Sequence, residues 1–210
     1  MNRILFLLGL ALCATPALAA DHEVSLEMGS LHANDTSWDM FSDTPSFNTY
    51  GLRVGYAFHD RIAAIAGYHH GANGMTVEAM DSGWESGDPP TFASAFYGDE
   101  YSLGIKADLP LSINLRPFAT VQALGVRGLI RLDDDAEHDD NLNQIQQGAF
   151  APGGMATGGI DLRIPIAQAK YCVASSLEFG YGKVLDLDFG DLGKLPMGGF
   201  VFRWGVGVRM

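Results

Sequence analysis

Apolar and polar side chains alternate along the chain from residue 23 to its last residue. In the closing stretch, residues 200–210, one parity is wholly apolar, from Phe200 to Met210, and the other holds two arginines, two glycines and Val201. Successive side chains of a β-strand point to opposite faces, so this stretch predicts a strand with one apolar face. The same alternation predicts eight strands, at residues 23–28, 50–59, 62–68, 100–109, 115–132, 159–164, 171–182 and 200–210.

The fifth predicted strand, residues 115–132, is long and extended, but its alternation has no clear phase. A β-bulge near Gly125 is the explanation we expect. One extra residue in a strand leaves two residues opposite one on its partner and disturbs the regular pairing at that point.

The gaps between the predicted strands alternate in length. Three are short, near residues 59–61, 110–112 and 165–170, whereas those at 34–48, 71–96, 133–152 and 184–197 are long and polar. Short turns at one end and long loops at the other, with an even number of strands, are typical of outer-membrane barrels. No run of about 20 apolar residues follows the first residues, which excludes a helical membrane protein.

The sizes of the side chains indicate which face points inward. An eight-stranded barrel has an interior that side chains nearly fill, so small residues suit it. The charged parity also carries the small residues, while the apolar parity carries aromatic residues and leucines; the glycines in question are Gly51, Gly55, Gly104, Gly159, Gly180, Gly205 and Gly207. We therefore predict an all-β fold, an eight-stranded antiparallel up-and-down transmembrane β-barrel, rather than a soluble barrel with its apolar face inward.

Aromatic side chains of the apolar parity gather at two levels. With the short turns placed in the periplasm, one set lies near the long-loop end: Tyr50, Tyr68, Tyr101, Phe179, Tyr181, Phe200 and Phe202. The other set lies near the short-turn end: Tyr56, Phe58 and Tyr171. Two aromatic belts are what the two interfaces of a bilayer select. The alternative is that these residues simply favour strands.

The succession of alternating strands, with short turns at one end and long loops at the other, resembles the small eight-stranded outer-membrane barrels, the group of the OmpA transmembrane domain, OmpX and OmpW. The closing strand is similar to the assembly signal that such barrels present to the barrel-insertion machinery; its residues are Phe202, Trp204, Val206, Val208 and Met210. The family usually ends on Phe or Trp, and this chain ends on Met210. The resemblance implies outer-membrane lipids and lipopolysaccharide as partners. We expect no peptidoglycan-binding domain after the barrel.

The first residues predict an export signal. Arg3 precedes an apolar run from Ile4 to Leu12 and a cleavage site of small residues after Ala19 or Ala20. We therefore expect a signal peptide at residues 1–20 and one barrel domain at residues 21–210, in the outer membrane of a Gram-negative cell. Cys172 is then the one cysteine left, so no internal disulfide is expected. The net charge of −12, without a basic cluster, excludes nucleic acid as a partner.

Charged residues of the inward parity predict a network of ion pairs inside the barrel. Buried charges persist when they are paired and hydrogen-bonded, and the two signs are nearly balanced here. The predicted network consists of Glu27, Arg53, Glu100, Lys106, Asp108, Asp161, Arg163, Glu178, Arg203 and Arg209. Arg203 is expected to pair with Glu178 on the preceding strand. Such a network forms either a polar plug or the wall of a narrow or gated pore.

The predicted loops offer acidic runs and aromatic side chains. Residues 133–140 and 186–191 are rich in Asp, but neither has the ligand order of a calcium loop, so solvated, self-repelling loops are expected. Five apolar loop residues either contact a partner or cap the mouth of the barrel: Trp38, Met40, Phe41, Trp84 and Phe96.

Catalysis is tested against two groups of barrels that modify lipid A. The deacylase group carries His-x-Ser on a strand, and no histidine of this chain has a serine two places on. The palmitoyltransferase group uses a histidine with an Asp-Ser pair, and His32 with Asp81 and Ser82 is a weak match. His69 and His70 are neighbours on a strand and face opposite ways, so they do not predict a metal site. We expect no catalytic residue, no metal and no cofactor.

The sequence therefore favours a non-enzymatic outer-membrane barrel with a plugged polar lumen. Its long extracellular loops would serve envelope integrity, adhesion or surface interaction. A narrow OmpW-like channel for small or apolar solutes is the alternative, and a lipid A-modifying enzyme is a further, less favoured one. Fold alone does not decide among these functions.

Overall fold

The computed structural model describes residues 22–33, 36–41, 46–78, 91–109, 111, 114–134, 145–166 and 171–210. Residues 1–21 lie outside this part of the chain, so the signal peptide at residues 1–20 and the start of the barrel domain stay predictions.

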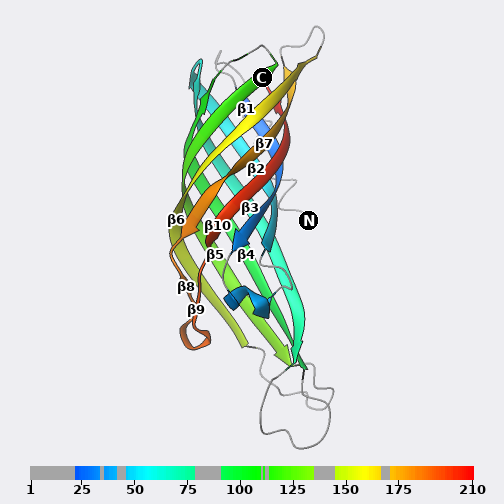
Figure 1. The fold of residues 1–210 in the computed structure, drawn as a ribbon, viewed down its shortest axis with the longest axis vertical. Helices are drawn as coiled ribbons and strands as arrows, with labels where there is room; N and C mark the ends of the chain where they lie inside the picture. Colours follow the sequence, from blue (N-terminus) through cyan, green and yellow to red (C-terminus); the bar gives the residue numbers. More distant parts are fainter. Residues whose placement is uncertain are drawn as a thin grey trace, which may run out of the picture.

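Eight antiparallel strands close into a barrel, and each pairs with its neighbours in the chain except where the last strand returns to the first (Figure 1). The order around the barrel is β1-β10-β7-β6-β5-β4-β3-β2. The strands are β1 (His22–Ala33), β2 (Ser46–His59), β3 (Ile62–Glu78), β4 (Thr91–Asp108), β5 (Leu115–Asp134), β6 (Ile145–Pro165), β7 (Cys172–Val184) and β10 (Gly198–Arg209). The predicted eight-stranded antiparallel barrel is confirmed.

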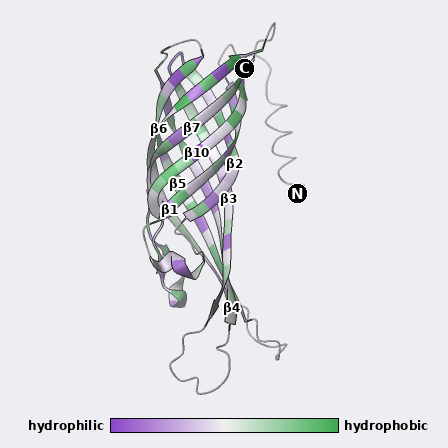
Figure 2. Cartoon of the chain, turned by 45° about the vertical axis from the view of Figure 1, so that its right-hand side comes forward, coloured by the Kyte–Doolittle hydropathy of each residue, from purple (hydrophilic) through white to green (hydrophobic). Residues whose placement is uncertain are grey.

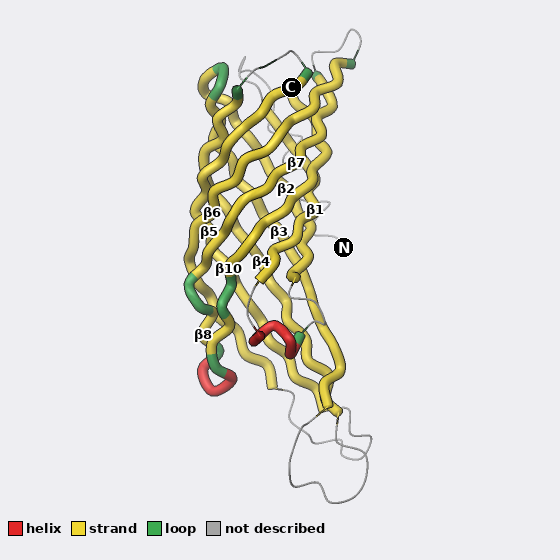
Figure 3. Tube along the Cα trace, in the orientation of Figure 1, coloured by secondary structure: helices red, strands yellow, loops and turns green. Residues whose placement is uncertain are grey.

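The short elements lie at the long-loop end of the barrel (Figure 3). They are the 3₁₀ helix η1 (Thr36–Met40) between β1 and β2, and three pieces between β7 and β10: β8 (Leu187–Asp188), η2 (Gly190–Leu192) and β9 (Lys194–Leu195). β8 and β9 pair as a separate two-stranded sheet. Among the described residues, neither helix has the length and apolar character needed to cross a membrane.

The two faces of the barrel wall differ in the way the alternation predicts. Hydrophobic and hydrophilic residues alternate along the barrel strands (Figure 2). Leu103 and Phe200 on the outer face are each 66% exposed, whereas Glu178 and His69 on the inner face are 0% exposed. An apolar outer surface suits contact with lipid. The closed barrel also leaves no backbone group unpaired in the hydrocarbon, which is the second requirement of a membrane.

The bulge expected near Gly125 is wrong. Residues of β5 pair with β4 and with β6 in unbroken register through this position. The register shift that the described strand pairs do contain lies on β2, between Ala57 and His59. The alternation of β5 loses its phase for another reason: its inward positions Leu124, Val126 and Ile130 are apolar and buried, like the residues of a soluble core.

Strands β1, β2, β3, β4 and β6 run at least four residues beyond the sequence pattern at the long-loop end, so the predicted loops at residues 34–48, 71–96 and 133–152 are partly wrong. β3 and β4 stay in register as far as the pair Glu78 and Thr91, and β5 and β6 as far as Leu132 and Ile145. β2 pairs with β3 only up to Gly71, and β7 pairs with β6 only from Gly153. Strands β3 to β6 therefore extend past the rest of the barrel at the long-loop end (Figure 1).

The interior of the barrel has two halves of different character. The half near the short turns is lined by buried charged and polar residues. The half near the long loops is filled by an apolar core, to which the barrel wall, η1 and the segment between β7 and β10 contribute; its members include Trp38, Phe41, Phe47, Phe96, Leu124, Val126, Ile130, Met155, Val184, Leu187, Phe189, Leu195, Met197 and Val201.

Candidate functional site

The interior of the barrel gathers the charged side chains that the sequence singled out. The inward positions of six strands place all ten of them in the lumen, and nine are buried; Glu100 has a side chain 17% exposed. A strand has period two, so a local sequence pattern is enough to aim a side chain inward. Which of these charges meet depends on how the strands are staggered around the barrel.

Arg53 of β2 lies at the centre of the network. Its Nη2 is 2.5 Å from Oε1 of Glu27 on β1, and its Nη1 is 2.6 Å from Oε2 of Glu178 on β7. The hydroxyl groups of Thr120 and Thr157 donate to the same Glu178 carboxylate. One guanidinium therefore joins two carboxylates from different sides of the lumen, an arrangement that compensates buried charge well.

Glycine at position 51 is required for this packing. A Cβ at Gly51 would lie 2.0 Å from the carbonyl oxygen of Tyr68 and 2.7 Å from the ring of His69. No side chain fits between these atoms. Because position 51 has no side chain, the ring of His69 can occupy this part of the lumen.

His69 of β3 is a network member that the sequence reasoning missed. Its Nε2 is 2.9 Å from Oε2 of Glu27, and its Nδ1 is 3.4 Å from Oε1 of Glu100. Sequence reasoning treated His69 as a strand residue but considered it only as a metal ligand. Its parity is opposite to that of the outward Tyr68 and therefore inward, which is the signal that could have found it.

The expected pair of Arg203 with Glu178 is wrong. The two residues are opposite each other in the pairing of β10 with β7. Arg203 nevertheless forms its ion pair with Glu100 of β4, across the lumen, because Arg53 already binds the Glu178 carboxylate. For Arg203, the residue directly opposite on the adjacent strand is thus not the ion-pair partner, whereas His69 does contact its cross-strand neighbour Glu100.

A second group of ion pairs lies nearer the short turns. Nζ of Lys106 is 2.7 Å from Asp161 and 3.4 Å from Glu23, and it stands 4.3 Å from the centre of the Phe118 ring. Asp108 receives both Arg163, at 2.8 Å, and Arg209, at 3.3 Å. Glu23 had the inward parity in the sequence but was left out of the predicted network.

The apolar core closes the other end of the lumen. Trp38 of η1 is 0% exposed, and its ring nitrogen donates a hydrogen bond of 3.0 Å to the carbonyl oxygen of Pro196. Its ring packs against those of Phe41, Phe47 and Phe96 at 5.2–6.4 Å between ring centres. Of the two roles considered for the apolar loop residues, Trp38, Phe41 and Phe96 take the capping role; Trp84 and the side chain of Met40 lie outside the described residues.

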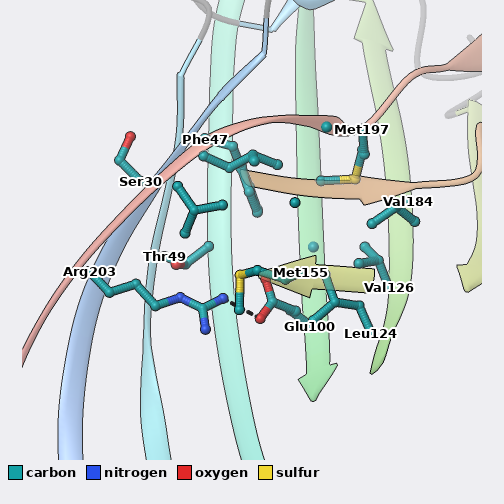
Figure 4. A pocket seen from close by; sticks show the side chains of 15 residues that line it. Ser30, Phe47, Thr49, Glu100, Leu124, Val126, Met155, Val184, Met197 and Arg203 are labelled. Atoms are coloured by element: carbon teal, nitrogen blue, oxygen red, sulfur yellow. Dashed lines mark hydrogen bonds and ion pairs between the residues drawn. The ribbon is translucent and has the colours of Figure 1, made fainter. Parts of the chain in front are cut away.

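A small cavity of about 20 Å³ separates the core from the ion pairs. Figure 4 shows Arg203 and Glu100 facing each other on its polar side, with Met155, Val126 and Met197 among the apolar residues around it. A cavity of this size has room for one water molecule. Through the described part of the barrel, the lumen is therefore packed rather than open.

The outer face carries the aromatic residues of the two predicted belts. All ten are exposed, from 37% for Tyr68 to 66% for Phe200. Several pack against one another across neighbouring strands, as Tyr68 does with Tyr101 at 5.4 Å and Phe179 with Phe202 at 5.1 Å. Tyr68 also donates a hydrogen bond to Asp99, which His70 contacts at 2.9 Å.

The closing strand places its apolar parity on the outer face. Phe202, Trp204, Val206 and Val208 of β10 are 40–43% exposed. β10 pairs with both β1 and β7, so this strand closes the barrel. The inward Arg203 and Arg209 join the ion pairs described above.

The candidates for catalysis and metal binding are not brought together. His69 points into the lumen and His70 lies on the outer face, as expected for neighbours on a strand. Asp81 and Ser82 lie outside the described residues, and His32 is exposed on β1. Within the described part of the chain, no group of three or more His, Cys, Asp or Glu side chains is arranged to hold a metal ion.

Comparison with known proteins supports the fold. No family model matches the sequence, and no curated protein matches it. Among solved structures, the outer-membrane protein OprG from Pseudomonas aeruginosa aligns with a TM-score of 0.51 at 11% identity, covering 91% of this chain and 96% of that one. Ail, the attachment invasion locus protein of Yersinia pestis, solved with the heparin analogue sucrose octasulfate, aligns with a TM-score of 0.50 at 12% identity, covering 91% and 98%. The chain thus shares the fold of small outer-membrane β-barrels.

Proposed function

For an eight-stranded outer-membrane β-barrel of this kind, we propose a closed, non-enzymatic protein whose lumen is a structural core and whose long-loop end is an interaction surface. The long loops face the outside of the cell, and the protein serves envelope integrity or adhesion there. Its apolar outer face contacts membrane lipids, including lipopolysaccharide, and the closing strand is the part that the insertion machinery receives.

The packing of the lumen is the observation that carries this proposal. The side chains of Glu27, Arg53 and Glu178 are at most 2% exposed, although all three are charged. The lining of an aqueous pore is wet, and these groups meet one another instead of water. Beyond them the apolar core around Trp38 covers the lumen on the long-loop side.

Conductance of single barrels in a planar bilayer tests the proposal. We expect the refolded protein to give no steady conductance steps, since two layers of packed side chains block the lumen. A porin reconstituted in the same way is the positive control, and protein-free detergent is the negative one. Reproducible steps that depend on folded protein would contradict the closed barrel and favour the narrow channel.

The narrow channel for small or apolar solutes stays the second candidate. The observation in its favour is the apolar half of the interior, where a solute would meet Phe47, Met155 and Val201 rather than water. Displacement of Trp38 and the segment between β7 and β10 would be needed to admit it. Uptake of an apolar dye into liposomes that contain the barrel would support this candidate.

The ligand of one structural neighbour does not carry over to this chain. Ail was solved with sucrose octasulfate, a heparin analogue and a polyanion. The segments that join the strands at the long-loop end of this barrel are strongly acidic. Like charges repel, so a sulfated polymer is not the class of partner that we propose.

A further inference from the structure

In the sequence, the segments that join the barrel strands at the long-loop end are rich in acidic residues, while Arg127, Arg131 and Lys183 lie on the strands at the same end. The four segments at the long-loop end, residues 34–45, 79–90, 135–144 and 185–197, contain thirteen acidic residues and one basic residue, Lys194. The short-turn segments, residues 60–61, 109–114 and 166–171, contain one acidic and two basic residues. A field of one sign over one end of a protein attracts partners of the opposite sign and raises their association rate.

An apolar cleft of about 260 Å³ opens at this acidic end. Its walls come from η1, from the inner face of β5 beyond the barrel proper, and from the segment that holds η2 and β9. The lining residues that the argument uses are Phe41, Ile130, Phe189, Leu192 and Leu195, and Ser37 and Lys194 lie at the rim. The cleft is large enough for one aromatic or aliphatic side chain, and most of its lining residues are apolar.

The cleft lies outside the lipid-covered part of the barrel. Gly125 of β5 pairs with Tyr101, which belongs to the aromatic belt on the long-loop side. Ile130 is five residues farther along β5, and at the rise and tilt of a barrel strand this places it roughly 13 Å beyond the belt. Membrane lipid therefore does not cover the cleft.

Exposed carboxylates lie next to the lining residues in the sequence, on the same short elements that form the cleft. Asp39 on η1 and Asp191 on η2 are exposed, and Asp188 on β8 is paired with Lys194 over 3.7 Å while both side chains stay at least 60% exposed. This pair is loose and open to water, so Lys194 neutralises only part of the acidic rim. A basic side chain brought by a partner would find carboxylates on these same elements.

We propose that this cleft docks an apolar side chain of a cationic peptide or protein segment, with Lys or Arg residues flanking the apolar one. The inference rests on the proposed interaction role of the long-loop end and names the class of partner. The apolar side chain supplies the anchor in a dry pocket, and the flanking charges meet the acidic rim and speed the encounter. Anionic partners are repelled by the same field.

Three short peptides test the proposal on the folded barrel in nanodiscs of phosphatidylcholine, a lipid without net charge. Each carries a fluorophore: Lys-Lys-Trp-Lys-Lys, the same peptide with Ala for Trp, and Glu-Glu-Trp-Glu-Glu. We expect fluorescence anisotropy to show binding of the first, at least about tenfold weaker binding of the second, and none of the third, with the first weakening as salt rises. Empty nanodiscs are the control for binding to lipid.

Two variants locate the site. Asp188→Asn with Asp191→Asn removes rim charge and keeps the cleft, and we expect binding of the cationic Trp peptide to fall at least about fivefold. Leu192→Lys places a positive charge in the cleft and should abolish binding of the cationic Trp peptide. Asp60→Asn, at an exposed position on the short-turn end, is the matched control and should change nothing.

Several results would overturn the inference. They are equal binding of the anionic and cationic Trp peptides, equal binding by empty nanodiscs, or unchanged binding in both site variants when gel mobility shows them folded. Conductance of the same preparation separates this failure from that of the proposed function. If the barrel does not conduct and binds no peptide, only the proposed docking site is wrong. If the barrel conducts, the proposed closed lumen is wrong.

Discussion

Arg53 is the residue that joins two buried carboxylates of the lumenal network. Its guanidinium lies between the carboxylates of Glu27 and Glu178, and all three side chains are at most 2% exposed. A buried charge without its partner is far more costly than the intact pair is stabilising. Arg53 therefore stabilises the packed interior by compensating the charges of these two carboxylates.

Replacing Arg53 tests this role. We expect Arg53→Met to remove the buried cation that Glu27 and Glu178 share and to lower the free energy of unfolding by about 3–5 kcal/mol. Urea unfolding of the refolded barrel in lipid measures the change. Arg127→Met removes an arginine from an exposed position on β5 and is the control, with an expected change within about 0.5 kcal/mol. Equal effects of the two variants would mean that the central pair does not stabilise the barrel.

At the scale of the element, β10 shows how one strand serves two environments. Its outward residues, Trp204 and Val206 among them, face lipid, and its inward Arg203 reaches the lumenal Glu100. Gly207 lies beside Val206 but is not free to vary, because a Cβ there would stand 2.3 Å from the carbonyl oxygen of Val24. Alternate positions of one strand thus obey different constraints.

A charge on the outward parity of β10 tests the lipid-facing assignment. We expect Val206→Arg to reduce stability in bilayers by about 2–4 kcal/mol if the position lies near the midplane. Val206→Leu keeps the surface apolar and is the matched control. Folding yield into phosphatidylcholine vesicles, followed by the change in gel mobility, compares them. A Val206→Arg protein that folds as well as the Leu variant would argue against lipid contact at this face.

The whole molecule is polarised from one end to the other. Ion pairs fill the lumen near the short turns, an apolar core fills it near the long loops, and the acidic segments lie beyond that core. An eight-stranded barrel has little interior volume, so side chains can fill it completely. Stability then comes from closure and packing, without a disulfide among the described residues.

Cysteine labelling on intact cells tests the orientation of the molecule. In a Cys172→Ser background, Asp191→Cys should react with a reagent that does not cross the membrane, because η2 is exposed at the long-loop end. Asp60→Cys, in the short turn between β2 and β3, should react only after the outer membrane is opened. The reverse pattern would place the short turns outside the cell and invert the proposed topology.

On most strands, the sequence determined to which face of the barrel wall each side chain points; on β5, whose alternation has no clear phase, it did not. Strand number, the polar inner face and the apolar outer face all follow from alternation with period two, which is a property of neighbouring residues and needs no distant contact. Arg53, Glu178 and Arg203 could be assigned to the lumen on this basis alone. His69 was missed because it was considered only as a metal ligand, although its parity already placed it on the inward face.

Only the tertiary structure decided which residues meet and how far the strands run. The stagger of a closed barrel brings together inward side chains from distant strands, so Arg203 finds Glu100 rather than its cross-strand neighbour Glu178. Strand length at the long-loop end depends on the successive pairing of β3 with β4, β4 with β5 and β5 with β6, which holds residues such as Gly71, Asn73 and Gly74 in register where the local pattern fails. The burial of Trp38 likewise depends on the tertiary structure. Its ring nitrogen donates to the carbonyl oxygen of Pro196, which is far away in the sequence, and its ring covers one end of the closed barrel.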